Sequence, residues 1–125
     1  MSRILVVDNN PADIRLVQEA LRELGRDDEI ETARDGDEAL AVLDGGESAP
    51  ESFDLVLLDI RMPRCSGVEV LRALGDRTAE QNLVMLTTTR AETEHRECLQ
   101  LGARRVLVKP SSFDELCTLL EGVLP

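Results

Sequence analysis

The feature that most constrains this chain is an apolar run that ends at a carboxylate. Residues 53–67 read FDLVLLDIRMPRCSG, and the apolar run Leu55–Leu58 continues without alternation up to Asp59. A short continuous apolar run is typical of a strand buried on both faces, as in a parallel sheet covered by helices. Pro63 cannot continue a strand, and Gly67 indicates a turn before the next helical pattern. The sequence therefore delivers Asp59 to the carboxyl end of a buried strand, where open α/β sheets usually bind ligands.

Four further strands are predicted along the chain, and each strand is followed by a helical pattern. They lie at residues 3–8, 29–33, 83–86 and 105–108. Side-chain caps of the helices are predicted at Asn10, Asp35 (with Glu38), Ser66, Thr89 (with Glu92) and Ser112. Regular alternation of strand and helix, without a repeat or a change in composition, predicts one α/β domain over residues 1–125. We expect a single-domain doubly wound (βα)5 flavodoxin-like sandwich with a five-stranded parallel sheet of order 2-1-3-4-5.

Composition and charge exclude several classes of function. The chain has 125 residues and a net charge of −11, so direct binding to nucleic acid, which rests on phosphate neutralisation, is not expected. No apolar run approaches the roughly 20 residues of a membrane span, and the N-terminus lacks the apolar core of a signal peptide. Cys65, Cys98 and Cys117 lie far apart without a metal-binding spacing, which indicates free thiols in a reducing compartment. We therefore expect a cytoplasmic protein that contacts neither nucleic acid nor membrane directly.

Polar side chains stand at the carboxyl ends of the predicted strands. Asp8 and Asn9 follow the first strand, and Asp59 follows the third. Thr87 follows the fourth strand, and Lys109, the only lysine in the chain, follows the fifth. Each has an ordinary explanation when taken alone: an acid or amide as a helix cap, threonine as a strand former, lysine as a solvated charge. Because these strand ends meet at one edge of such a sheet, we expect the side chains to lie together in one site at that edge.

Four motifs stand in register along the chain: VVDNNPADIRL, LVLLDIRMPRCSG, VMLTTT and ARRVLVKP. In their order and approximate separations they resemble the receiver domain of bacterial and archaeal two-component response regulators. The resemblance covers essentially the whole chain, and four motifs in register are far more specific than one. The NPADIRL and TTT details are most similar to small stand-alone regulators that partner phytochrome-type histidine kinases.

The resemblance implies a role for each converging residue. Asp59 would accept a phosphoryl group from a sensor histidine kinase, and Thr87 and Lys109 would contact the phosphoryl oxygens as a switch. Mg²⁺ would be held by Asp8, by Asp59 and by the backbone carbonyl of Arg61. The chain would then be a phosphoacceptor that assists its own phosphorylation and dephosphorylation rather than a turnover enzyme. Its other partner would be a downstream protein or a second copy of itself.

Two positions depart from the family pattern. Asn9 stands where a second acid usually binds the metal directly, so one negative charge is missing and its own ligation should be weak. We therefore expect a reduced affinity for Mg²⁺. Val106 stands where the family commonly has an aromatic residue that moves with the threonine. Both departures favour an alternative function, a degenerate receiver that acts as a phosphorylation-independent interaction module, whereas the intact Asp59, Thr87 and Lys109 oppose it.

A hydrolase on a doubly wound sheet represents a third class of function. Aspartate-nucleophile phosphatases and dehalogenases also carry a nucleophile at a strand end. They usually have a second acid two residues later, where this chain has Arg61, and a cap domain that 125 residues do not accommodate. A flavodoxin-like cofactor binder is no better supported, because no glycine-rich phosphate loop follows the first strand. The sequence therefore disfavours the enzyme class.

Overall fold

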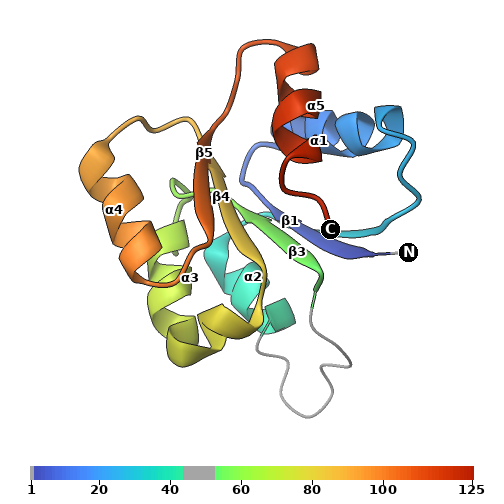
Figure 1. The fold of residues 1–125 in the computed structure, drawn as a ribbon. Helices are drawn as coiled ribbons and strands as arrows, with labels where there is room; N and C mark the ends of the chain where they lie inside the picture. The colour runs from blue at the N-terminus through green and yellow to red at the C-terminus, as the bar shows by residue number, and fades with distance from the viewer. Residues whose placement is uncertain (1, 44–52) are drawn as a thin grey trace.

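A five-stranded parallel sheet lies between two layers of helices in the computed structural model, which describes residues 2–43 and 53–125 (Figure 1). The strands are β1 (Arg3–Val7), β2 (Glu29–Ala33), β3 (Leu55–Leu58), β4 (Leu83–Thr87) and β5 (Arg105–Val108). Their order is β2-β1-β3-β4-β5, and every neighbouring pair is parallel. The predicted doubly wound sheet of order 2-1-3-4-5 is confirmed.

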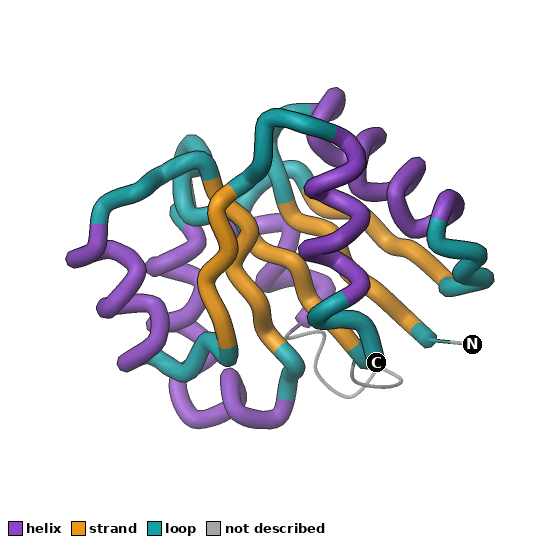
Figure 2. The backbone as a smooth tube through the Cα atoms, turned by 45° about the horizontal axis from the view of Figure 1, so that its top comes forward, coloured by secondary structure: helices purple, strands orange, loops and turns teal. Residues whose placement is uncertain are grey.

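Helices cover both faces of this sheet (Figures 1 and 2). They are α1 (Pro11–Glu23), α2 (Gly36–Leu43), α3 (Gly67–Leu74), α4 (Glu92–Gln100) and α5 (Phe113–Glu121), with a 3₁₀ helix η2 (Gly75–Glu80) after α3. Helices α1 and α5 pack on one face, and α2, α3 and α4 pack on the other. No helix in the described ranges is both long enough and apolar enough to cross a membrane.

The strands carry continuous apolar runs because each of their faces meets a helical layer. On β1, Ile4 and Val6 belong to the core under α1 and α5, whereas Leu5 and Val7 belong to the core under α2, α3 and α4. Successive side chains of a strand point to opposite faces, so both sets must be apolar. All four residues of β3 are at most 1% exposed. This two-sided burial explains the unalternated run that precedes Asp59.

Four of the five predicted helix caps are confirmed. The side chains of Asn10, Ser66 and Ser112 cap α1, α3 and α5, and at the start of α2 the Asp35 carboxylate accepts a hydrogen bond from the Glu38 N–H at 2.8 Å. The predicted cap of α4 by Thr89 with Glu92 is wrong, because Ala91 occupies the N-cap position and provides no side-chain hydrogen bond. The Thr89 hydroxyl instead lies 2.8 Å from the Glu94 carboxylate, two residues beyond Glu92, and accepts a hydrogen bond from the Ala91 N–H at 3.3 Å. Thr89 therefore ties the β4–α4 loop to the first turn of α4 through Glu94.

Gly67 allows α3 to start directly against the end of β3. A Cβ atom at Gly67 would lie 2.2 Å from the backbone oxygen of Asp59 and 2.9 Å from Cα of Ile60. The Gly67 N–H also donates a hydrogen bond to the Ile60 carbonyl at 2.8 Å. The backbone that carries Asp59 is thus packed against the first turn of α3 at a distance that only glycine permits.

We expect Gly67→Ala to lower the free energy of unfolding by about 1–3 kcal/mol, because the added methyl group must displace backbone rather than a flexible side chain. Gly122→Ala is the matched control, since the nearest atom to its added Cβ would lie at 3.4 Å and its φ is −71°. The control should change stability by less than about 0.5 kcal/mol. Urea unfolding followed by circular dichroism measures both variants, and equal stabilities would contradict this account of Gly67.

Candidate functional site

Four polar side chains lie together at the carboxyl edge of the sheet. Asp8 follows β1, Asp59 follows β3, Thr87 ends β4 and Lys109 follows β5. Asp8 and Asp59 are each 5% exposed, and Thr87 is fully buried. Backbone hydrogen bonds between neighbouring strands hold these positions, including Asp59 N to Val7 O at 3.0 Å and Lys109 N to Thr87 O at 2.7 Å. The register of the sheet, rather than a flexible loop, therefore fixes where these groups sit.

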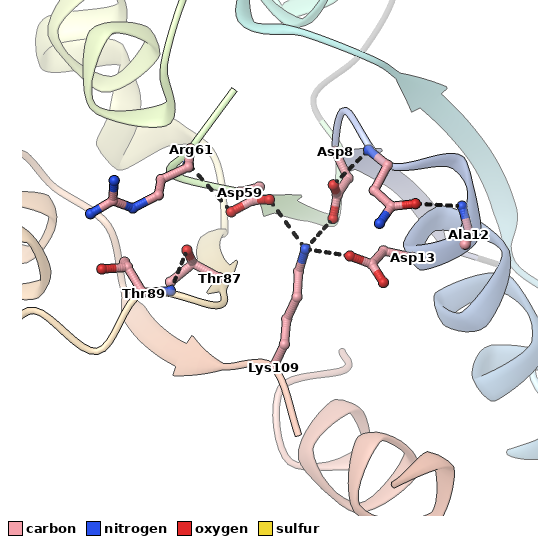
Figure 3. Close-up of polar contacts among 9 residues, drawn as sticks. Asp8, Ala12, Asp13, Asp59, Arg61, Thr87, Thr89 and Lys109 are labelled. Carbon is pink, nitrogen blue, oxygen red and sulfur yellow. Dashed lines mark hydrogen bonds and ion pairs between the residues drawn. The ribbon is translucent and has the colours of Figure 1, made fainter. Parts of the chain in front are cut away.

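Lys109 is the centre of the site because its ammonium contacts three carboxylates (Figure 3). Its Nζ lies 2.6 Å from Asp8 Oδ2, 2.9 Å from Asp13 Oδ2 and 3.1 Å from Asp59 Oδ2. An ammonium has three N–H donors, so these three oxygens satisfy all of them. The Lys109 side chain is 13% exposed, and those of Asp8 and Asp59 are 7% exposed. The cluster carries an excess of negative charge and is shielded from water over most of its surface.

Asp13 is the site residue that sequence reasoning missed. It lies in the first turn of α1 and its side chain is 29% exposed. An acid in a first turn is favourable for the helix dipole alone, so its residue type gave no reason to assign it to the site. Only the topology could have pointed to Asp13, because α1 begins at the carboxyl end of β1 and therefore beside the predicted site.

Burial and the neighbouring charges act in opposite directions on the ionisable groups of the site. Burial raises the pKa of Asp8 above its ordinary value, and the hydrogen bond from Lys109 offsets only part of this effect. Burial alone would lower the pKa of Lys109, but its contacts with Asp8, Asp13 and Asp59 outweigh burial and raise it well above its ordinary value. Lys109 therefore remains a cation throughout the physiological pH range.

The second oxygen of each strand-end carboxylate faces its own loop (Figure 3). Asp8 Oδ1 accepts a hydrogen bond from the Asn10 N–H at 3.0 Å, and Asp59 Oδ1 accepts a long one from the Arg61 N–H at 3.4 Å. Asn9, in contrast, is exposed and lines an open cavity of about 500 Å³ together with Arg61 and neighbouring residues. The loops after β1 and β3 therefore border one cavity beside Asp59.

The oxygen atoms after β1 and β3 would suit a hard divalent cation. Asp8 and Asp59 carry carboxylates, and Asn9 and Arg61, which line the cavity, carry an amide oxygen and a backbone carbonyl. Mg²⁺ is commonly bound through one or two carboxylates, with phosphate and water oxygens completing its shell. Within residues 2–43 and 53–125 no group of three or more His, Cys, Asp or Glu side chains is arranged to hold a metal ion. The donor set fits Mg²⁺, and Asn9 contributes no charge to it.

Thr87 is held by its own loop and is connected to α4. Its Oγ1 accepts a hydrogen bond from the Thr89 N–H at 3.2 Å (Figure 3). The Thr89 hydroxyl contacts the Glu94 carboxylate at 2.8 Å, and Glu94 pairs with the Arg61 guanidinium at 3.2 Å. A continuous chain of polar contacts thus runs from Thr87 through α4 to the loop that follows Asp59.

Val106 lies on β5, half-buried against the core layer under α2, α3 and α4. The chain has no Tyr or Trp, and its two Phe residues are Phe53 and Phe113. Phe53 precedes β3 and Phe113 begins α5, so neither occupies the position of the family's moving aromatic residue. Any connection from Thr87 to the surface must therefore use another route.

The sequence of residues 4–121 matches the family model of the response regulator receiver domain. The chain belongs to the response regulator receiver family. The members of this family are the receiver domains of two-component systems, in which phosphorylation on an aspartate and the use of Mg²⁺ are general. The family predicted from the four sequence motifs is confirmed.

Individual relatives support the same assignment. The receiver is similar to the probable methanogenesis regulatory protein FilR2 of Methanothrix harundinacea (strain 6Ac), with 35% identity over 126 residues, 96% of this chain and 79% of that protein. The phosphorylated cyanobacterial phytochrome response regulator RcpA superposes with a TM-score of 0.85 at 32% identity, covering 98% and 90% of the two chains. The Mn²⁺-bound response regulator Rcp1 gives 0.85 at 31%, covering 98% and 91%. The predicted similarity to phytochrome response regulators is confirmed.

Several other curated relatives are longer than this receiver. They are bacterial transcriptional regulatory proteins that are 35–36% identical to it, and the chain spans 45–50% of their length. The similarity therefore concerns about half of each of those proteins.

We expect Lys109→Met to lower the free energy of unfolding by about 2–4 kcal/mol at neutral pH, because it leaves buried carboxylates without their counter-charge. The loss of Lys109 should also raise the pKa of Asp8 beyond the effect of burial. The folded variant then binds protons more readily than its unfolded chain, so its deficit relative to the unsubstituted protein should shrink as the pH falls from about 7 to about 4.

Urea unfolding at several pH values measures this effect. Arg96→Met on the exposed side of α4 is the control for loss of a positive charge, and it should stay within about 0.5 kcal/mol of the unsubstituted protein. A deficit for Lys109→Met that is constant across the pH range would refute the electrostatic explanation.

Proposed function

We propose that this receiver accepts a phosphoryl group on Asp59 from a phosphohistidine of a sensor histidine kinase. The observation that carries the proposal is the position of Asp59, a buried carboxylate at a strand end with Lys109 Nζ at 3.1 Å from its Oδ2. Phosphoryl transfer needs positioning and charge neutralisation more than acid–base assistance. A carboxylate is an established covalent nucleophile, and Lys109 provides a fixed positive charge beside it.

The transfer step forms one bond and breaks one. A carboxylate oxygen of Asp59 attacks the phosphorus, the P–N bond of the phosphohistidine breaks, and its electron pair returns to the imidazole nitrogen. The imidazole leaves as a neutral ring whose other nitrogen carries a proton. The product on Asp59 is an acyl phosphate, which bears more negative charge than the carboxylate it replaces. Lys109 is the side chain placed to neutralise part of that charge.

A bound Mg²⁺ would supply the remaining charge neutralisation at the phosphoryl oxygens. Asp8, Asp59 and the backbone carbonyl of Arg61 would hold it, with a weak contribution from Asn9. The solved Rcp1 structure is a Mn²⁺-bound response regulator, which supports the binding of a divalent cation by this receiver. The missing charge at Asn9 is the reason to expect weaker binding here.

Thr87 and Lys109 would convert the phosphorylation into a change of shape. For its hydroxyl to reach a phosphoryl oxygen, Thr87 must give up the hydrogen bond from the Thr89 N–H. That exchange would disturb the contacts of Thr89 with Glu94 and of Glu94 with Arg61. Since Val106 cannot act as an aromatic relay, the start of α4 is the route that the contacts favour. The reader of this change would be a downstream protein or a second copy of the chain.

We further propose that the receiver is not a turnover enzyme. Asp59 itself becomes modified, so each molecule accepts one phosphoryl group and assists only its own phosphorylation and dephosphorylation. We place it in the cytoplasm, on the basis of three cysteines without metal-binding spacing and an acidic composition. Its net charge of −11 argues against direct contact with nucleic acid.

A second candidate is a degenerate receiver that binds its partners without phosphorylation. Asn9 and Val106 favour it, because they weaken the cation site and remove the usual aromatic relay. The contact between Asp59 and Lys109 argues for the first candidate, since a module without phosphoryl chemistry gains nothing from clustering buried carboxylates.

We expect incubation with a small phosphodonor such as acetyl phosphate, in the presence of Mg²⁺, to add one acid-labile phosphoryl group, detected by intact-mass spectrometry. Asp59→Asn should abolish the adduct, because an amide is not a nucleophile at phosphorus. Asp76→Asn, at an exposed acid of η2, is the matched control and should react like the unsubstituted protein. The absence of any adduct on the unsubstituted protein would favour the degenerate receiver.

We expect Asn9→Asp to tighten Mg²⁺ binding by at least about tenfold. A charge pair at about 4 Å in a partly shielded site is worth roughly 4 kcal/mol before the desolvation of the ion is subtracted, so a net gain of this size is conservative. Isothermal titration calorimetry with Mg²⁺ measures both proteins, and Asn10→Asp serves as the control for charge added one residue away. Equal affinities of Asn9→Asp and the unsubstituted protein would show that Asn9 does not limit the site.

A further inference from the structure

Lys109 is anchored from helix α1 as well as from the sheet. The Asp13 carboxylate contacts its ammonium at 2.9 Å, closer than the 3.1 Å contact with Asp59. Figure 3 shows the ammonium between these two carboxylates, with Asp13 reaching it from the first turn of α1. The contact spans 96 residues of sequence and joins an otherwise ordinary helix start to the centre of the site.

Asp13 also restores the charge that Asn9 omits. A receiver with an acid at position 9 would have its third carboxylate on the side of the cation. Here the third carboxylate is Asp13, and it faces Lys109 rather than the cavity that Asn9 and Arg61 line. The site therefore has as many carboxylates as a receiver with an acid at position 9, but the third carboxylate contacts Lys109 instead of facing the cation.

We propose that Asp13 is a positioning residue for phosphoryl transfer, whose carboxylate holds the Lys109 ammonium beside Asp59. This inference rests on the proposed phosphoacceptor function. A lysine side chain is a flexible four-carbon stem, so its charge is useful only where other groups fix it. One carboxylate oxygen of Asp59 becomes the bridging oxygen of the acyl phosphate when Asp59 is phosphorylated, and Asp8 has a cation to bind. Of the three carboxylates that contact Lys109, Asp13 is the one that takes part neither in phosphorylation nor in binding the cation.

The alternative explanation is that Asp13 merely stabilises the start of α1. A first-turn acid does so through the helix dipole whether or not it touches another side chain. The two explanations differ in what happens to Lys109 itself when Asp13 is replaced, and the chain offers a direct probe. Lys109 is its only lysine, so ¹⁵N-lysine labelling yields a single side-chain ammonium signal.

The experiment compares Asp13→Asn, Asp13→Glu and Asp37→Asn with the unsubstituted protein. Asp37 is the matched control because it is an exposed acid in the first turn of α2, on the other face of the sheet. We expect Asp13→Asn to shift the Lys109 signal and speed its proton exchange with water. Asp13→Glu should largely restore the signal, since it keeps a carboxylate within reach. Asp37→Asn should leave it unchanged.

Phosphorylation by acetyl phosphate with Mg²⁺ is then timed by intact-mass spectrometry. Asp13→Asn should react at least about tenfold more slowly, the factor expected for loss of one charge-assisted hydrogen bond, and Asp13→Glu should recover most of the rate. An unchanged Lys109 signal in Asp13→Asn would overturn the proposal, as would a changed signal with an unchanged or faster reaction. If the unsubstituted protein accepts no phosphoryl group, the proposed function and the role of Asp13 in transfer both fail, while the signal still reports whether Asp13 holds Lys109.

Discussion

The contact of one ammonium with three carboxylates is the interaction on which the rest of the site depends. Asp8 and Asp59 have side chains that are only 7% exposed, and a buried carboxylate without a partner is strongly destabilising. Lys109 supplies the partner from the far end of the chain, 50 residues after Asp59 and 101 after Asp8. The acids can therefore be buried only in a fold that brings the end of β5 close to the ends of β1 and β3. Reactivity and stability of the site rest on the same contacts.

The parallel sheet meets this requirement because all its strands end at one edge. The order β2-β1-β3-β4-β5 places β1 beside β3, so Asp8 and Asp59 become neighbours. The long side chain of Lys109, which follows β5, reaches back to both of them. Gly67 completes the arrangement by letting α3 start within van der Waals distance of the Asp59 backbone. The apolar runs that insert the strands between two helical layers thus also determine where the polar groups emerge.

Most of the fold and half of the site could be predicted, for a common physical reason. Asp8, Asp59 and Lys109 each follow a strand that a continuous apolar run predicts to be buried. The topology of a parallel sheet then brings the carboxyl ends of these strands together. Asp13 and Glu94 could not be assigned in this way, since they lie on helices where an acid in the first turn is favourable without any tertiary contact. The choice of Thr89 between Glu92 and Glu94 depends on the path of the loop before α4. Local capping patterns do not encode that path, which explains why the predicted cap was wrong.

Asn9 and Asp13 are physically coupled through Asp8. Asp8 lies 2.6 Å from Lys109 Nζ and is also the one full acid that the loop after β1 offers to a cation, so ammonium and cation compete for it. With a neutral Asn9 the cation depends more heavily on Asp8. If Lys109 had only Asp8 and Asp59 as partners, a cation that took Asp8 would leave the ammonium poorly held just when the phosphoryl group needs it. In the proposed mechanism Asp13 would remove this conflict, because Lys109 could yield Asp8 to the cation and still keep its carboxylate contact on α1. The contact of Asp13 with Lys109 would thereby also favour binding of the cation at Asp8.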